Sequence, residues 1–275
     1  MATEKQKDIK IVVFHYKPDS VIANSSEYVH IWAGKNGAET IPGFIGDDTG
    51  DNISDKNAYY SELTGLYWVW KNMKTDIIGS CHYRRYFTKS KFPLSYKIKQ
   101  LFYYPVGIFR KRRGLVYTLN LKYWKRKILS ENEVLPVLDS YDAILPVSKI
   151  FKYSVEEHYR RYHNIEDLRL IEKIITEKHP DYSETFKAVL AGNIMFANNM
   201  FVLKWEMFDK LMEWLFSILF EFEKQINLVD YKGYQERILG FLSERLITVW
   251  IMHNNINYKE LPLIYFKKLK SNLDA

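Results

Sequence analysis

The sequence predicts a single α/β domain over residues 1–275, with a basic insertion at residues 88–130 and a helical C-terminal part. Short apolar runs alternate with segments of helical periodicity, which is the pattern of a sheet that is at least partly parallel. A chain of 275 residues can bury a large core without a disulfide or a metal ion. Since neither an internal repeat nor a linker rich in Gly or Pro divides the chain, we expect one domain.

Three strands and one helix are predicted in the first third of the chain. Residues 9–14 and 77–82 are apolar, as buried strands are, and residues 28–33 form another short strand. Residues 43–51 are acidic and rich in turn-forming Gly and Asp. A Ser-Asp pair directly before residues 56–72 can cap a helix there.

The remaining two thirds of the chain contain more helix than strand. Helical periodicity is strongest near the C-terminus, where two long amphipathic segments follow one another. The predicted elements are a strand at 141–146, a helix at 156–178, a strand and turn at 191–201, and helices at 205–226 and 234–253.

Composition excludes several classes of protein. Hydrophobic residues make up 47% and charged residues 27%, close to globular averages, which argues against a disordered chain. The single cysteine, Cys81, cannot form an internal disulfide, so a reducing compartment is expected. The N-terminus has no apolar signal segment, and no stretch approaches the roughly 18–20 apolar residues that cross a bilayer. A soluble, cytoplasmic protein is therefore expected.

Positive charge is concentrated in the insertion. Residues 89–127 contain twelve Lys or Arg, interleaved with aromatic residues, and no Asp or Glu, so without them the net charge of +7 becomes −5. Such a surface can dock on an anionic membrane, follow a nucleic-acid backbone, or be solvated without a special role. The residues expected to dock on a membrane are Arg110, Lys111, Arg112, Arg113, Lys125, Arg126 and Lys127.

Two adjacent arginines follow the predicted strand 77–82, in the segment His82-Tyr-Arg-Arg-Tyr-Phe87. Open α/β sheets bind ligands beyond the carboxyl ends of their strands, and guanidinium groups bind phosphate oxygens through two hydrogen bonds. Because successive strand side chains alternate between faces, Arg84 and Arg85 reach one site only if the strand has ended. The segment predicts an anion site, with a structural ion pair as the alternative.

Two acidic segments are candidates for acid–base chemistry. Residues 47–51 hold three Asp residues that could bind a divalent cation, bond ribose hydroxyls, act as a general base, or simply form a turn. Glu244 lies in an otherwise apolar helix, seven residues after Arg237 and on the same face. Burial would raise the pKa of Glu244 and suit it to a base, and a structural Glu–Arg pair is the alternative.

Several familiar motifs are absent from the sequence. The seven histidines show no zinc-binding spacing, and His158 and His163 are interpreted as helix-surface residues. There is no G-x-G-x-x-G, no Walker A and no G-x-S-x-G pattern. These absences weigh against a Rossmann dehydrogenase, a P-loop NTPase and an α/β-hydrolase.

Seven segments, taken in order, carry a resemblance that extends from about residue 9 to residue 262. They are the first strand running into His15, Asp51-Asn-Ile-Ser-x-Lys-Asn57, Glu62-Leu-Thr-x-Leu-Tyr-Trp-x-Trp-Lys-Asn72, Ile78-Gly-x-x-His-Tyr-Arg-Arg-Tyr-Phe87, Tyr141-Asp-x-Ile-Leu-Pro146, Gly192-Asn-Ile-Met-Phe196 and Gly240-Phe-Leu-Ser-Glu-Arg-Leu246. The chain resembles a bacterial family of capsule, exopolysaccharide and O-antigen glycosyltransferases, long catalogued only as a domain of unknown function. The segments ending at Asn72 and Phe87 are the most specific.

The resemblance implies a GT-A-like nucleotide-sugar-binding domain with a central, mostly parallel sheet. The implied activity is an inverting transfer of a sugar, with galactofuranose favoured by relatives, from a UDP-sugar to a growing, lipid-linked surface polysaccharide. The Asp-x-Asp metal motif of GT-A enzymes is absent, and the His82 segment stands in its expected place. We therefore expect no required cofactor, with Mg²⁺ or Mn²⁺ as the alternative. Gly192 stands where the family often has a larger residue, which would alter the acceptor site.

The resemblance also implies roles for individual residues. Glu244 is expected to deprotonate the acceptor hydroxyl, with Asp48 and Glu62 as reserves. The residues expected to bind the donor are His15, Tyr16 and Lys17 at the uracil, Asp51, Lys56 and Asn57 at the nucleotide or sugar, and His82, Arg84 and Arg85 at the diphosphate. The residues expected to bind the acceptor are Asn193, Arg237 and Arg245.

The expected partners are a UDP-sugar donor, a glycan or polyprenyl-diphosphate-linked acceptor, and the anionic inner face of the cell membrane, where the protein would be peripheral. The alternative function is a non-catalytic protein that binds nucleic acid or glycan through the basic insertion. The sequence contains no RRM, KH or helix-turn-helix pattern, so no nucleic-acid partner is expected.

Overall fold

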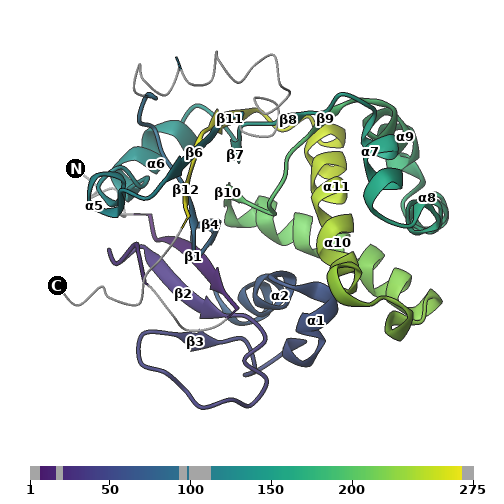
Figure 1. The fold of residues 1–275 in the computed structure, drawn as a ribbon, viewed down its shortest axis with the longest axis horizontal. Coiled ribbons are helices and arrows are strands. Elements are labelled where there is room, and N and C mark those ends of the chain that lie inside the picture. Colours follow the sequence, from purple (N-terminus) through teal and green to yellow (C-terminus); the bar gives the residue numbers. More distant parts are fainter. Residues whose placement is uncertain (1–6, 17–20, 93–97, 99–112, 268–275) are drawn as a thin grey trace, which may run out of the picture.

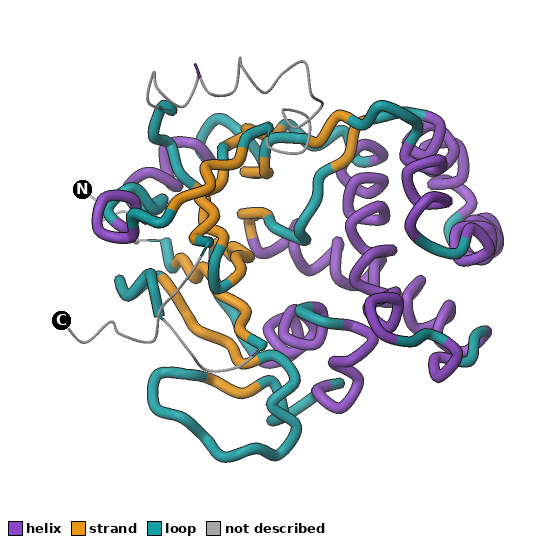
Figure 2. Tube along the Cα trace, viewed as in Figure 1, coloured by secondary structure: helices purple, strands orange, loops and turns teal. Residues whose placement is uncertain are grey.

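The structure is a computed structural model of the chain that describes residues 7–16, 21–92, 98 and 113–267. A central sheet separates two groups of helices (Figure 1). The larger group of helices lies together on one side of the sheet (Figure 2). The short helices α5 (Leu121–Lys125) and α6 (Glu131–Leu138) pack on the other side.

Parallel strands form one half of the sheet. β1 (Ile9–His15) pairs in parallel with β2 (Tyr28–Trp32) on one side and with β4 (Ile77–His82) on the other, and β2 continues to the two-residue β3 (Ile45–Gly46). β1 and β4 have core packed on both faces, which is why their sequences are almost continuously apolar. The three strands predicted in this part of the chain are confirmed.

The antiparallel strand β10 (Phe201–Lys204) joins this half to the rest of the sheet. It pairs with β4 on one side and with β7 (Ala143–Pro146) on the other, and β11 (Tyr258–Leu261) runs parallel to β7. The further strands are β12 (Leu263–Phe266), which pairs with β5 (Arg85–Phe87) and β6 (Leu115–Thr118), and the separate pair β8 (Lys149–Ile150) and β9 (Ile194–Met195). The insertion predicted at residues 88–130 includes β6, a strand of the main sheet, and helix α5 in its described part.

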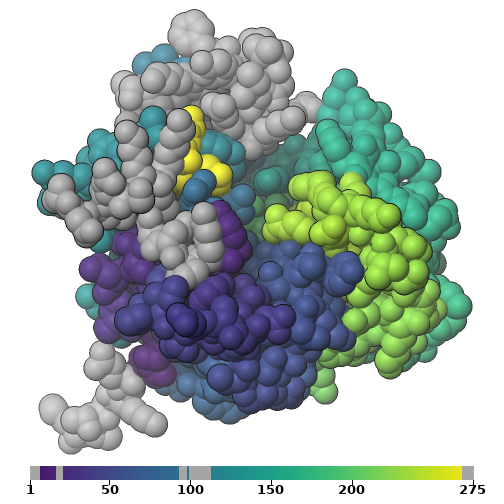
Figure 3. Space-filling view, turned by 60° about the horizontal axis from the view of Figure 1, so that its bottom comes forward, coloured from purple at the N-terminus to yellow at the C-terminus, as the bar shows by residue number. Residues whose placement is uncertain are grey.

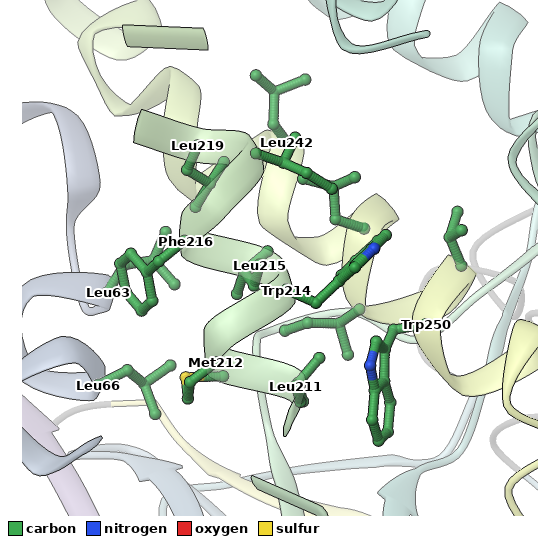
Figure 4. Packing of buried hydrophobic residues seen from close by; sticks show 14 of the residues in the cluster. Leu63, Leu66, Leu211, Met212, Trp214, Leu215, Phe216, Leu219, Leu242 and Trp250 are labelled. Carbon is green, nitrogen blue, oxygen red and sulfur yellow. The ribbon is translucent and has the colours of Figure 1, made fainter. Parts of the chain in front are cut away.

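Alternation along β1 divides the core between the two faces of the sheet. Val12 and Phe14 pack with the larger group of helices, whereas Ile11 and Val13 pack on the opposite face. The long helix α10 (Trp205–Gln225), predicted as residues 205–226, crosses the larger core. Figure 4 shows apolar side chains of α10 between those of α2 (Leu63–Asn72) and α11 (Ile238–His253).

The predicted helix at residues 56–72 is interrupted in the structure. After α1 (Asn57–Tyr60) the chain turns at Ser61, whose φ of 52° is in the left-handed region, and α2 then begins at Leu63. The Asn57 amide and the Thr64 hydroxyl both donate to the Ser61 carbonyl, so the turn is held from both sides. This break places Ser61 and Glu62 at a junction between helices instead of inside one.

The segments predicted as single helices at residues 156–178 and 234–253 are also interrupted in the structure. The segment 156–178 forms α7 (Val155–Tyr162) and α8 (Ile165–Lys178), because the Asn164 side chain accepts from the Glu166 N–H and caps a new helix. The segment 234–253 begins as a 3₁₀ helix at Gly233–Arg237 before α11. Helix α9 (Ser183–Ala191) was not predicted.

Gly65 of α2 is expected to be intolerant of a side chain. Helix-interior Gly→Ala changes usually stabilise a protein by about 1 kcal/mol, but a Cβ at Gly65 would lie 2.5 Å from the Phe14 ring. Because the core is closely packed on this face, we expect Gly65→Ala to lower the free energy of unfolding by about 1–3 kcal/mol. Urea unfolding of the two proteins measures the difference, and a more stable variant would contradict this packing of α2 on β1.

Two general features complete the fold. Cys81 is buried on β4 and forms no disulfide, and burial raises the pKa of its thiol to about 12. None of the helices in the described ranges is both long enough and apolar enough to cross a membrane.

Candidate functional site

A cavity of about 740 Å³ lies at the carboxyl ends of β1 and β4. The β4–β5 turn, the junction between α1 and α2, and the first turns of α11 close its sides. α1 and α11, blue and yellow-green in the space-filling view of Figure 3, lie against each other although about 180 residues separate them in the chain. This is the edge of the sheet where open α/β folds bind their ligands.

The cavity brings together residues that the sequence assigned to all three roles. Those in its lining are the donor-site candidates His15, Tyr16, Asn57, His82, Arg84 and Arg85, the base candidates Glu62 and Glu244, and the acceptor-site candidates Arg237 and Arg245. They come from four separate segments of the chain, at residues 15–16, 57–62, 82–85 and 237–245. The predicted anion site and the predicted acid–base groups therefore share one cavity.

Four other candidates lie outside this lining, each with partners of its own. Asp48 accepts from the Lys35 ammonium at 2.9 Å and from the Gly37 N–H. Burial alone acts to raise the pKa of Asp48, but these hydrogen bonds lower it below its ordinary value. The carboxylate is thus held as a structural anion in its loop.

Asp51, Lys56 and Asn193 are the other three candidates outside the lining. Asp51 accepts from the Tyr67 hydroxyl at 3.0 Å, and Lys56 pairs with Glu223 of α10 at 2.8 Å. Asn193 is exposed beside the β8–β9 pair. Lys17, the remaining donor-site candidate, lies outside the described residues.

Cations outnumber carboxylates in the cavity. The described lining contains five cationic side chains, Arg84, Arg85, Lys149, Arg237 and Arg245, and two carboxylates. In the described part of the chain, Nε of Arg84 and Nε of Arg245 are buried without a hydrogen-bond partner. Buried donors are normally satisfied, and guanidinium N–H groups in such a position are able to bind an anion.

A two-residue turn before β10 holds both carboxylates of the cavity. Asn198 and Asn199 have φ values of 78° and 48°, in the left-handed region that Asn tolerates. The Asn198 N–H donates to Glu244 at 2.6 Å, and the Asn199 amide donates to Glu62 at 2.9 Å. The same turn accepts from His82, whose Nε2 lies 2.6 Å from the Asn198 carbonyl oxygen. One turn therefore fixes three groups of the site.

Each of the two carboxylates of the cavity lies close to a different set of basic side chains. Glu62 lies 3.6 Å from the Arg237 guanidinium and 3.9 Å from His82 Nε2, while Glu244 lies 3.7 Å from Arg245. Burial lowers the pKa of His82 although Glu62 acts in the opposite direction, so the imidazole is neutral near pH 7. Arg237 also donates to the Ser61 hydroxyl at 2.8 Å, which ties α11 to the strained turn between α1 and α2.

Within the ranges that the structure describes, no group of three or more His, Cys, Asp or Glu side chains is arranged to hold a metal ion. Metal independence stays a prediction of the sequence.

The family model described as a domain of unknown function, DUF4422, matches residues 10–255. The chain belongs to this family. The sequence predicted a family catalogued as a domain of unknown function, and this match agrees with that prediction.

A solved structure titled "WbbM bifunctional glycosytransferase apo structure" is similar to this DUF4422 chain, with a TM-score of 0.80 and 28% sequence identity. The match covers 97% of this chain and 48% of that one, so the DUF4422 chain spans about half the length of the protein that it matches. The match confirms the predicted α/β class with a central, mostly parallel sheet. A search of curated proteins found no match.

Several lining residues of the DUF4422 chain were not singled out from the sequence. His158 and His163, interpreted above as surface residues, both line the cavity, so that interpretation was wrong. His158 stacks on Phe151 with ring centroids 3.9 Å apart, and His163 bonds to Gln235 at 2.8 Å. His158 lies within α7, and His163 directly follows the end of α7 at the break before α8.

Lys149 and the Asn198–Asn199 turn were also missed. Lys149 lies on β8, a strand of two residues that has no detectable periodicity. Burial lowers its pKa, whereas the nearby Glu244 raises it. The Asn-Asn pair directly before an apolar run was a usable signal, because Asn favours left-handed turns at strand ends.

Proposed function

We propose that the protein is a glycosyltransferase that transfers a sugar from a UDP-sugar to a growing, lipid-linked surface polysaccharide, with inversion at the anomeric carbon. The observation that carries the proposal is the cavity itself, which joins five cations to two carboxylates at the carboxyl ends of parallel strands. The fold that this chain shares with a glycosyltransferase structure supports the proposal. Galactofuranose, as the sugar, rests on the sequence resemblance.

The cationic side of the cavity suits the diphosphate of the donor. Arg84 and Arg85 follow β4, and β5 begins at Arg85, so the two guanidinium groups lie at a turn and both line the cavity. Guanidinium groups there would hold the two phosphates and stabilise the negative charge that develops as UDP leaves. We therefore propose that the reaction does not need a metal ion.

The carboxylate side suits activation of the acceptor. An acceptor hydroxyl oxygen would form the new bond to the anomeric carbon while the bond from that carbon to the UDP oxygen breaks and its electron pair leaves with the diphosphate. The hydroxyl proton must pass to a base. We propose Glu244 for this role because it lies in the cavity and is aimed by the Asn198 N–H.

Thermal unfolding with a panel of nucleotides tests the proposed function. UDP, GDP, CDP and ADP would each be added with EDTA or with Mn²⁺, since a ligand that binds only the native state raises the apparent melting temperature. We expect UDP to raise it in EDTA. A shift that appears only with Mn²⁺ would contradict metal independence, and no shift with any nucleotide would contradict the enzyme assignment. Salt-dependent binding to RNA or DNA without UDP binding would instead favour the nucleic-acid alternative.

The described part of the insertion supports docking on an anionic membrane. Lys125, Arg126 and Lys127 are exposed at the end of α5, close in sequence to Leu119 and Tyr123, which are 69% and 50% exposed. Cations beside exposed apolar and aromatic side chains are typical of peripheral binding. Arg113 is half-buried, and Arg110, Lys111 and Arg112 lie outside the described residues.

Sedimentation with vesicles tests this surface. The protein is expected to bind vesicles of phosphatidylglycerol and phosphatidylcholine at low salt. Replacing Lys125, Arg126 and Lys127 with Gln should weaken binding by about 1 kcal/mol per cation. Three Gln replacements at Lys173, Lys187 and Lys210, on other helices, are the matched control. Equal weakening by both triple variants would show that net charge alone, and not this surface, drives the binding.

A further inference from the structure

A second cavity, of about 690 Å³, lies beside the first. Its described lining comes from residues 160–164, at the break between α7 and α8, and from residues between positions 226 and 235, which connect α10 with α11. His163 lines both cavities. In the 3₁₀ helix before α11, Tyr234 lines the first cavity and the next residue, Gln235, lines the second. The two cavities therefore share a wall.

Hydrogen bonds hold this shared wall in place. The Gln235 side chain donates from Nε2 to the Tyr162 carbonyl oxygen at 2.8 Å, so its Oε1 accepts from His163 Nδ1, also at 2.8 Å. The rings of His163 and of Phe241 on α11 have centroids 4.4 Å apart. At His163 the wall is a single side chain thick, so a chain molecule bound in the first cavity has to cross only this side chain to enter the second.

The shared wall adjoins the residues expected to bind the acceptor. Arg237 follows Gln235 by two residues in the same 3₁₀ helix. Burial lowers the pKa of His163, and the nearby Arg245 guanidinium acts in the same direction, although the hydrogen bond with Gln235 opposes it. Arg245 in turn lies 3.7 Å from Glu244, the proposed base. A molecule whose hydroxyl reacts at Glu244 can therefore extend into the second cavity.

The charges around the second cavity are balanced, in contrast to those of the first. Arg160 and Arg161 each pair with a glutamate of their own helix, α7, at 2.8 and 2.9 Å. One further Asp and one further Lys of the described lining have opposite charges. A cavity with this balance is better suited to an uncharged polar ligand than to a phosphate.

Amide and phenol groups supply the other polar contacts. Asn164, Asn227 and Gln235 line the second cavity, together with Tyr162, which is 56% exposed. Tyr234, which is 65% exposed, stands at the shared wall on the side of the first cavity. A sugar ring has hydroxyl groups around its edge and C–H groups on its faces. Amides can donate to and accept from the hydroxyls, and aromatic rings can pack against the faces.

We propose that the second cavity binds the uncharged sugars of the acceptor glycan that precede its reacting sugar. The inference rests on the proposed function and deepens it, because it extends the acceptor site beyond the reacting hydroxyl. In a lipid-linked chain that grows at its free end, these sugars lie between the reacting sugar and the lipid. Binding energy from such remote sugars can raise the rate of transfer itself. The protein is therefore expected to prefer acceptors that are long enough to reach this cavity.

Transfer from UDP-galactofuranose to octyl galactosides of increasing length tests the proposal. In the wild type, kcat/KM is expected to rise roughly 10- to 100-fold from the monosaccharide to the tetrasaccharide, as two or three added hydrogen bonds would give. Asn227→Trp places a large ring in the second cavity from an exposed position. It should remove most of this rise and leave both kcat/KM for the monosaccharide and the dissociation constant of UDP unchanged.

Two further variants separate loss of the cavity from general damage. Tyr162→Ala removes an exposed ring of the lining and is expected to lower kcat/KM for the tetrasaccharide by about 3- to 10-fold. Asn132→Trp makes the same replacement as Asn227→Trp at an exposed position on α6, on the other face of the sheet, and should leave kcat/KM for every acceptor unchanged. Circular dichroism would verify that each variant is folded.

Saturation-transfer NMR of the tetrasaccharide, with UDP present, detects binding without turnover. The sugars next to the octyl group should receive saturation from the wild-type protein and not from Asn227→Trp. Equal kcat/KM for all acceptors, or an unchanged preference for the tetrasaccharide in folded Asn227→Trp, would overturn the proposal. So would a protein that binds UDP but does not bind the tetrasaccharide. Failure of the proposed function looks different, because the protein would then bind no nucleoside diphosphate and transfer no sugar to any acceptor.

Discussion

Glu244→Gln is expected to lower the turnover of sugar transfer by about 10²- to 10⁴-fold, the usual contribution of a general base. Glutamine has the size of glutamate and an oxygen that can still accept from the Asn198 N–H, which now lies 2.6 Å from the carboxylate. It cannot take the proton of the acceptor hydroxyl at neutral pH. The dissociation constant of UDP should change little, since the residues proposed to contact the uridine and the diphosphate do not include Glu244. Steady-state kinetics and calorimetry with UDP measure the two effects.

Two parallel variants identify the base among the three candidate carboxylates. Glu62→Gln is expected to weaken the contacts with Arg237 and Asn199, and so to lower activity less than Glu244→Gln does. Asp48→Asn should leave turnover nearly normal, because Asp48 lies outside the lining and bonds to Lys35. Near-normal turnover in Glu244→Gln, with loss of activity in Glu62→Gln, would move the role of the base to Glu62.

The sequence predicted the parts of the fold that local patterns determine. β1 and β4 were found because strands with core on both faces are apolar throughout. Helix α10 was found because twenty-one residues of amphipathic periodicity leave no other interpretation. The carboxyl ends of β1 and β4, and with them His15, His82 and the two arginines, followed from those strands.

The breaks between helices and the short strands were not predictable in the same way. Ser61 adopts a left-handed conformation that few non-glycine residues favour, and its hydroxyl accepts from Arg237, 176 residues later in the chain. β5 has only three residues, and its partner β12 lies near the C-terminus. Such features depend on contacts between distant segments, which periodicity in a single sequence does not contain.

Asp48, Asp51 and Lys56 were predicted to lie in the site but are outside the cavity lining, for a related reason. A carboxylate or ammonium in the sequence carries no sign of the partner that will neutralise it. Asp48 finds Lys35 within its own loop, whereas Lys56 finds Glu223, 167 residues away, where Tyr60 also donates. Arg84 differs from both, because its Nε is buried in the described structure without any acceptor.

Arg84→Ala is therefore expected to weaken UDP binding by about 10- to 100-fold, the range for a lost hydrogen bond to a charged group. The UDP affinity of Arg84→Lys should lie between those of Arg84→Ala and the wild type, because an ammonium keeps the charge but lacks the planar pair of donors. Arg160→Ala, which removes an exposed ion pair with Glu156, is the control and should leave binding unchanged. Calorimetry with UDP measures the three dissociation constants.

Uridine, which lacks the diphosphate, decides how Arg84 acts. The Arg84 guanidinium also lies 4.8 Å from the centroid of the Tyr83 ring, which lines the same cavity. If Arg84 holds the phosphates, Arg84→Ala weakens UDP binding and leaves uridine binding as it was. Equal weakening of both ligands would mean that Arg84 acts by supporting Tyr83 at the base. An unchanged UDP affinity in the folded variant would show that Arg84 does not bind the diphosphate. The reason to expect transfer without a metal ion would then be lost.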